Sequence, residues 1–241
     1  MKKALLILSS AFVLVAISCT KELASGSLKF YVDSDIDVTL ATKSKISDII
    51  ALPNGENFRL AIKNSTDTLI WNDLLKNWSE TTKLSEGTYK VTANYGGANE
   101  EGVEKPWFLG EQEFSIIGDK TTEVKIPVEL KNCIIKVNCT DIFKNYFTNY
   151  QFSLTTGANH EFEIDKDWTV PIFINADKVI VKGKLTNQGG AVQNFEKTYD
   201  NLKAATCYTL TFDASNIGSL KVTVTFNDDV TTVDLGDLEI N

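Results

Sequence analysis

The sequence has few of the residues on which most catalytic and metal sites are built. It contains one histidine, one arginine and four cysteines in 241 residues, and no two cysteines have Cys-x-x-Cys spacing. A zinc site needs several such ligands, so these counts disfavour one. The chain also lacks a phosphate-binding P-loop, a Gly-x-Ser-x-Gly elbow and a His-Glu-x-x-His motif. We therefore expect a protein that is not an enzyme and that holds no metal and no cofactor.

Positive charge is also scarce. Lys and Arg together number 24 against 32 Asp and Glu, which gives a formal net charge of -8 at pH 7. A protein that binds duplex nucleic acid needs a basic face to displace the counterions of the phosphates. We therefore expect no nucleic-acid partner.

Only one long apolar segment is present, and it lies at the N-terminus. Residues 4–17 are almost entirely apolar and follow two lysines. A transmembrane helix needs about 20 apolar residues, whereas a short apolar run after basic residues is typical of a secretory signal peptide. Ser18 and Cys19 end the segment and resemble the processing site of a bacterial lipoprotein. We favour a lipid on Cys19; the alternative is ordinary signal cleavage beside an unmodified cysteine.

The rest of the chain has the composition and patterning of β-structure. Threonine occurs 25 times and proline only 4 times, and β-branched residues are enriched in strands. Apolar and polar residues alternate in many short segments, for example at Phe58, Leu60 and Ile62. These segments recur with polar turns between them, which predicts an all-β fold of antiparallel sandwiches. Only residues 73–78 and 140–146 have short helical character.

The patterning divides the chain into four segments. We expect a signal peptide at residues 1–18, a lipid-carrying tether at 19–25, one β-sandwich at 26–129 and a second at 130–241. Each of the two long segments has the size of a small domain. No Pro/Gly-rich linker separates them, and the strand pattern runs almost through the boundary. The connection between the two sandwiches is therefore expected to be stiff.

The three cysteines beyond the tether are expected to be free thiols. Cys133 and Cys139 share a strand and a face with apolar neighbours, and about 20 Å of strand between them prevents a disulfide. Cys207 has the opposite parity to Tyr208, Leu210 and Phe212, which face the core by pattern. We therefore predict that Cys133 and Cys139 are buried and that Cys207 points outward.

Aromatic and acidic residues gather between positions 95 and 110. Tyr95, Glu100, Glu101, Trp107 and Phe108 could form a sugar-binding surface, because rings stack on pyranose faces and carboxylates accept hydroxyl groups. The alternative is that Trp107 or Phe108 fills one end of the sandwich, and we favour it because tryptophan is usually largely buried.

Other candidate groups have ordinary interpretations. His160 lies in a Gly- and Asn-containing turn and is expected to be a surface histidine. Acidic clusters at residues 100–104, 228–229 and 234–239 lack the spacing of an EF-hand and are expected to be solvated turns. A pair of glycosidase-like carboxylates stays open as an alternative, because sequence spacing does not give the distance between two carboxylates in space.

The order of several short motifs resembles a family of uncharacterised Bacteroidales lipoproteins that are themselves similar to fimbrillins. The motifs are GSLKF at 26–30, VTLATK at 38–43, FRLAI at 58–62, LSEGTYKVTA at 84–93 and PWFLG at 106–110. The resemblance covers most of the chain after the signal peptide and implies tandem transthyretin-like Greek-key sandwiches. Fimbrillins that polymerise resemble precursors cut after an arginine in the N-terminal domain, whereas the one arginine here, Arg59, lies within a predicted strand. This departure counts against maturation at an arginine and against the role of a polymerising stalk subunit.

The resemblance also implies a function and a location. It implies a non-catalytic protein of the cell envelope. Together with the lipid expected on Cys19, this favours an outer-membrane protein at the cell surface, with the periplasmic face as the open alternative. Its role would be adhesion or fimbria-related assembly, with an envelope or fimbrial protein as partner. The alternative function is a glycan-binding surface lipoprotein that captures polysaccharide. Exposed aromatic rings would favour the alternative, and a detachable strand would favour assembly.

Replacing Cys19 by alanine tests the lipid attachment. Without the thiol no acyl chain can be added, and an acidic chain has no electrostatic attraction to anionic lipid. We expect wild-type protein in the membrane fraction and Cys19→Ala protein in the soluble periplasmic fraction, as measured by fractionation and immunoblotting. Two results together would contradict the lipoprotein interpretation. The Cys19→Ala protein would stay in the membrane fraction, and the wild-type protein would incorporate no acyl group.

Overall fold

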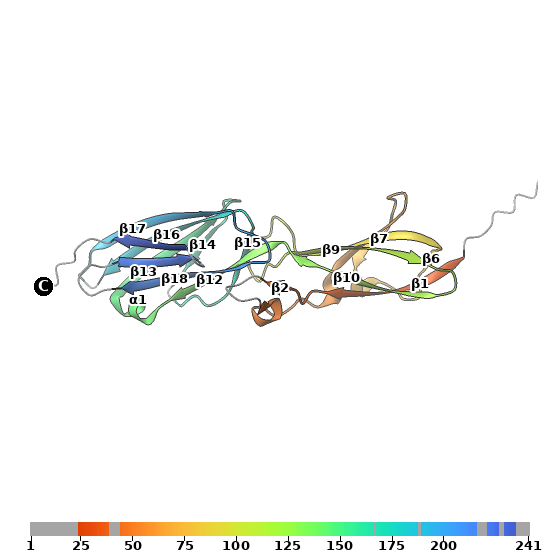
Figure 1. Cartoon of the computed structure of the whole chain (residues 1–241), viewed down its shortest axis with the longest axis horizontal. Helices are drawn as coiled ribbons and strands as arrows, with labels where there is room; N and C mark the ends of the chain where they lie inside the picture. Colours follow the sequence, from red (N-terminus) through yellow and green to blue (C-terminus); the bar gives the residue numbers. More distant parts are fainter. Residues whose placement is uncertain are drawn as a thin grey trace, which may run out of the picture.

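Strands from the two halves of the sequence form two groups that follow one another along an elongated molecule (Figure 1). The computed structural model describes residues 24–38, 44–165, 167–187, 189–215, 221–226 and 229–234. The expected signal peptide and Cys19 lie outside these residues. No helix in the described part of the chain is long and apolar enough to cross a membrane. The fold is all-β, as the alternating pattern predicts.

Two sheets form the first half. The five-stranded sheet is antiparallel throughout, and its strands in spatial order are β11 (Glu129–Leu130), β9 (Phe108–Ile116), β7 (Gly87–Tyr95), β4 (Arg59–Asn64) and β5 (Leu69–Leu74). The three-stranded sheet has the order β10 (Thr121–Pro127), β1 (Ser25–Asp33) and β6 (Lys83–Ser85). A small hairpin of β2 (Asp37–Val38) and β3 (Ser44–Lys45) and three 3-10 turns, at Ile46–Asp48, Gly55–Asn57 and Leu75–Asn77, complete this half.

Two further sheets form the second half. The six-stranded sheet has the order β20 (Asp229–Asp234), β19 (Lys221–Phe226), β18 (Cys207–Ser215), β12 (Asn132–Cys139), β15 (Ile172–Asn175) and β8 (Gly102–Val103). The four-stranded sheet has the order β14 (Glu161–Ile164), β13 (Phe147–Thr156), β16 (Lys178–Asn187) and β17 (Val192–Asp200). The C-terminal strand β20 pairs with β19 within the chain, and residues 235–241 lie outside the described residues.

The helix α1 (Asp141–Tyr146) joins β12 to β13, close to the predicted position. Thr140 is its N-cap, and the Thr140 hydroxyl accepts a hydrogen bond from the backbone N–H of Phe143 at 3.2 Å. Phe143 is fully buried under the helix. The second helical candidate, at residues 73–78, forms the end of β5 and one 3-10 turn.

The two halves share a strand plan that the sequence pattern does not reveal. In the first half, β1 lies between β6, which is antiparallel to it, and β10, which is parallel. In the second half, β12 lies in the same way between antiparallel β15 and parallel β18. Both parallel pairs depart from the purely antiparallel prediction. Alternation shows which face of a strand is apolar, but the connections of the chain decide the direction of its neighbours.

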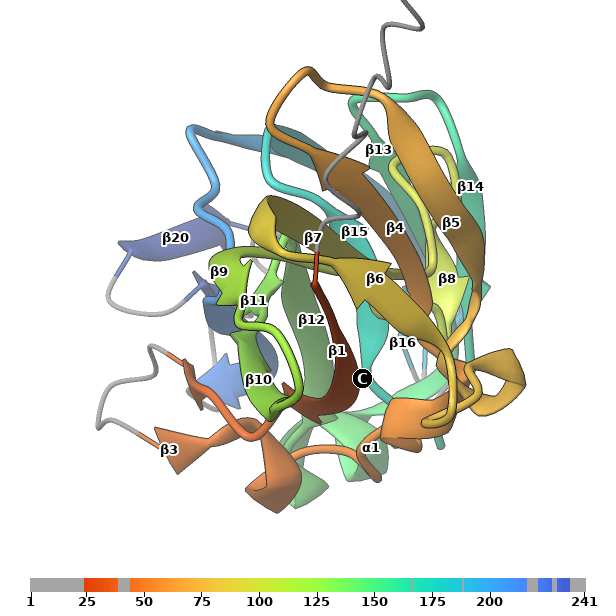
Figure 2. The same cartoon turned by 90° about the vertical axis from the view of Figure 1, so that its right-hand side faces the viewer.

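Each half has its own apolar core. The first core contains Leu60, Val91 and Phe108, and the second contains Phe152, Leu154 and Phe212, all of them fully buried. The Phe152 and Phe212 rings stack with centroids 3.9 Å apart. Figure 2 looks along the molecule from the end that carries β6, and the first half lies in front of the second. The proposed division between residues 129 and 130 falls within β11, the strand before β12.

Three residues of the second half pack against the first core. Ile134, Phe173 and Cys207 are at most 1% exposed and belong to the first core, whereas Cys133 and Ile174 on the same strands belong to the second. The prediction that Cys207 points outward is therefore wrong. It assumes that solvent covers the face opposite Leu210 and Phe212, but the first half covers that face. Cys133 and Cys139 are buried as predicted, and all three thiols are free.

Thiol reactivity tests this burial. Burial raises the pKa of Cys133 to about 12 and that of Cys139 to about 11, and it also raises the pKa of Cys207. Since the thiolate is the reactive form, we expect a folded Cys19→Ala protein to react very slowly with Ellman's reagent. After unfolding without reductant, the protein should release three equivalents of the reagent's coloured thiolate, one for each remaining cysteine. A fast-reacting thiol in the folded protein, or fewer than three after unfolding, would contradict the structure.

Candidate functional site

The loop between β7 and β9 connects the two halves. Residues 96–107 leave the first half, contact the second and return. At the start of the loop, Gly96 has φ +73°, and a Cβ there would lie 2.4 Å from the carbonyl oxygen of Pro106, so the loop closes only on a glycine. In its middle, β8 adds an antiparallel edge strand to the second-half sheet, with Gly102 opposite Phe173 and Val103 opposite Ile172.

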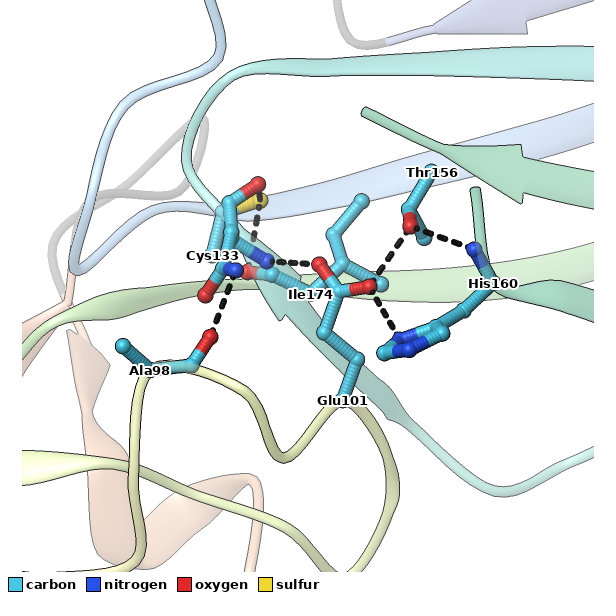
Figure 3. A network of polar contacts seen from close by, with 7 residues as sticks. Ala98, Glu101, Cys133, Thr156, His160 and Ile174 are labelled. Atoms are coloured by element: carbon cyan, nitrogen blue, oxygen red, sulfur yellow. Dashed lines mark hydrogen bonds and ion pairs between the residues drawn. The ribbon is translucent and has the colours of Figure 1, made fainter. Parts of the chain in front are cut away.

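The carboxylate of Glu101 is the centre of a polar network on this loop (Figure 3). Its side chain is 0% exposed. One oxygen accepts a hydrogen bond from the backbone N–H of Asn175 at 2.6 Å. The other accepts from the Thr156 hydroxyl at 2.6 Å and lies 2.8 Å from Nδ1 of His160. A buried carboxylate is stable only with such partners, so the network fixes the loop to the ends of β13 and β15.

Two asparagines hold the ends of the loop. The Asn175 amide donates to the carbonyl of Ala98 at 2.7 Å, and the Asn132 side-chain oxygen accepts from the backbone N–H of Trp107. Asn132 and Asn175 lie opposite each other in β12 and β15. The loop is therefore hydrogen bonded to the second half near its start, in its middle and at its end.

The structure divides the five predicted ligand-surface residues between buried and accessible positions. Phe108 is fully buried beside Phe58, with ring centroids 6.0 Å apart, so an aromatic residue does fill this end of the first core. Glu101 is committed to the network above. Neither residue can contact a ligand at the surface. The prediction that Glu101 and Phe108 belong to a ligand surface is therefore wrong. Trp107 is half-buried, and its indole N–H donates to the Asn94 side chain at 3.1 Å.

Tyr95 and Glu100 line clefts beside the loop. One cleft, of about 410 Å³, lies between the halves and is lined by residues 49–53, Tyr95, Val103, Glu104, Pro106, Val170, Pro171 and Phe173. The other, of about 290 Å³, is lined by Asn57, Arg59, Leu74, Asn94, Tyr95, Gly96, Glu100, Glu104, Lys105 and Pro106. Tyr95, Glu104 and Pro106 belong to both linings, so the two clefts adjoin.

A third concavity, of about 450 Å³, lies on the four-stranded sheet. Lysines and glutamates such as Lys182 and Glu196, whose charged groups are 3.5 Å apart, line much of it. Charges of opposite sign that alternate between strands are typical of a solvated sheet face.

His160 occupies the predicted surface position. Its side chain is 45% exposed in the turn after β13. Its pairing with Glu101 could not be predicted from the sequence, because 59 residues separate the two. Among the described residues, no group of three or more His, Cys, Asp or Glu is placed to hold a metal ion. Asp228 and residues 235–239, which belong to the acidic clusters, lie outside the described residues.

Comparisons with known proteins identify a family. Residues 24–241 match the model of a family described as "Domain of unknown function (DUF4493)". No curated protein matches the chain.

Similar solved structures come from Bacteroidales. A fimbrial assembly protein from Parabacteroides distasonis ATCC 8503 has a TM-score of 0.47 and 11% identity, over 74% of this chain and 91% of that one. A "putative cell adhesion protein" from Bacteroides eggerthii DSM 20697 has a TM-score of 0.44 and 13% identity, over 88% and 97%. One of the "putative polysaccharide binding proteins (DUF1812)" from Bacteroides thetaiotaomicron VPI-5482 has a TM-score of 0.45 and 10% identity, over 88% and 99%.

Replacing Glu101 tests the network. Glu101→Ala leaves buried donors without an acceptor, and each such donor costs about 1–3 kcal/mol. We expect the free energy of unfolding to fall by about 2–3 kcal/mol, measured by urea denaturation. The matched control is Glu100→Ala, whose side chain is 57% exposed and which should change stability by less than about 0.5 kcal/mol. An equal decrease in the free energy of unfolding for the two variants would show that the network does not stabilise the junction.

Proposed function

This chain belongs to the DUF4493 family, and we propose that it acts as a non-catalytic, lipid-anchored protein of the cell surface in adhesion or fimbria-related assembly. The attachment would be a lipid on Cys19 in the outer membrane. The partner would be an envelope or fimbrial protein. The fimbrillin resemblance of the sequence motifs supports this role.

The observation that carries the proposal is the end-to-end arrangement of the two halves. The first strand, β1, begins at the end of the molecule that is remote from the second half (Figure 1). Apolar packing of Ile134, Phe173 and Cys207 and the Glu101 network resist bending at the junction. An anchor before β1 would therefore hold the second half away from the membrane, where it can meet a partner.

Glycan capture is the second candidate function. Tyr95 and Glu100 line accessible clefts, whereas Phe108 and Glu101 are withdrawn into the fold. A ring and a carboxylate at one cleft are groups that sugar sites use.

Surface labelling of intact cells tests the proposal. We expect an antibody against the second half to label intact cells that produce the wild-type protein but not cells that produce Cys19→Ala. Deleting the gene should lower attachment to surfaces or partner cells and leave growth on polysaccharides unchanged. Labelling only after permeabilisation would contradict a surface role, and a growth defect without an attachment defect would favour glycan capture.

A further inference from the structure

We propose that the two adjoining clefts beside the β7–β9 loop form one binding site for a neutral oligosaccharide. This inference rests on the second candidate function, glycan binding, and gives it a site and a class of ligand. The site has an apolar compartment between the halves and a polar compartment on the first half, and Tyr95, Glu104 and Pro106 stand where the two meet.

The apolar compartment fits the carbon face of a sugar ring. Its volume of about 410 Å³ lies within the usual range of small-ligand sites, about 300–1,000 Å³. Pro106 comes from the loop, and Pro171 and the 43% exposed Val170 come from the second half. Tyr95 and Glu104 are the polar side chains in its lining. Apolar walls with few polar groups favour a ligand that has one apolar face and some hydroxyl groups.

The polar compartment fits hydroxyl groups rather than a charged ligand. Its lining holds two carboxylates, of Glu100 and Glu104, two cations, of Arg59 and Lys105, and the two side-chain amides of Asn57 and Asn94. Their formal charges cancel. Carboxylates accept, cations donate, and amides do both, which matches hydroxyl groups that also do both. An anionic or cationic ligand would meet as much repulsion as attraction there.

The walls of the site are held in place without a ligand. The Tyr95 ring packs on Phe58, with centroids 5.3 Å apart. The Asn94 amide donates to the carbonyl of Gly96 at 2.9 Å and accepts from the Trp107 indole. The Glu101 network fixes the loop that carries Glu100 and Glu104. A ligand would therefore lose little affinity to the ordering of the protein.

Both halves contribute to the site, so its shape depends on the junction. Val170, Pro171 and Phe173 belong to the second half, and the other lining residues belong to the first half or to the loop. Glu104 has φ +56°, a conformation that is uncommon for glutamate, and such conformations cluster at functional sites.

Titration of the purified full chain tests the inference. The probes are neutral gluco-, manno- and galacto-oligosaccharides, with oligogalacturonate as the anionic and chitosan oligomers as the cationic comparison. We expect at least one neutral series to bind saturably in calorimetry and to bind about tenfold more tightly than either charged series. No binding of any neutral series at millimolar concentration, or equal binding of a charged series, would overturn the inference.

Variants locate the binding. Tyr95→Ala and Glu104→Gln should each weaken binding about tenfold or more, as loss of a central contact does. The matched controls are Tyr31→Ala, at a tyrosine 42% exposed on β1, and Glu113→Gln, at an exposed glutamate on β9; both should bind as the wild type does. Urea denaturation of all four variants shows whether they are folded. Unchanged binding by folded Tyr95→Ala and Glu104→Gln proteins would overturn the site.

Attachment and surface labelling separate this inference from the proposed function. Attachment by cells that produce wild-type protein, together with no oligosaccharide binding by the purified protein, would overturn the inference and leave the adhesive role intact. Oligosaccharide binding that Tyr95→Ala abolishes, by a protein that is absent from the cell surface, would support the inference and overturn the adhesive role.

Discussion

Where the six-stranded sheet meets the first half, its strands β12, β15 and β18 are buried on both faces. The arrangement of the two halves depends on this burial. Residues of β12, β15 and β18 alternate between the two cores: Ile134, Phe173 and Cys207 face the first, and Cys133 and Ile174 face the second. Full burial of a large apolar side chain contributes about 1.5–3 kcal/mol. Rotation of one half against the other would expose these side chains to water. The packing of these side chains therefore opposes rotation of one half against the other.

Polar groups give this apolar contact its register. Apolar packing has little directionality, whereas the Glu101 carboxylate is satisfied only when Asn175, Thr156 and His160 stand around it. A buried charge that loses its partners is strongly destabilising. By contrast, an exposed ion pair such as Lys63 with Asp67, 2.9 Å apart, contributes about 1 kcal/mol or less. The one buried carboxylate in this network thus matters more to the arrangement than the surface pairs do.

The same loop crosses the junction and lines the clefts of the proposed oligosaccharide site. Its inner side carries Glu101 and β8 into the second half, and its outer residues Glu100 and Glu104 line the clefts. In the proposed site, the groups that hold the loop in place are therefore different from those that would contact a ligand. Phe108, the residue that follows the loop, is buried beside Phe58 in the first core.

Much of the local structure could be predicted from the sequence: strands such as β4 and β12, the helix after Thr140, the burial of Cys133 and Cys139 and the surface position of His160. These features follow from local alternation, from capping and from turn residues, which act over a few positions. Features that depend on distant segments could not be predicted: the burial of Cys207, the parallel partners of β1 and β12, the two-residue strand β8 and the network of Glu101, whose partner Asn175 is 74 residues away. The physical reason is that alternation shows which face of a strand is apolar. It does not show which distant segment covers the other face, and it does not show where a single carboxylate finds its donors.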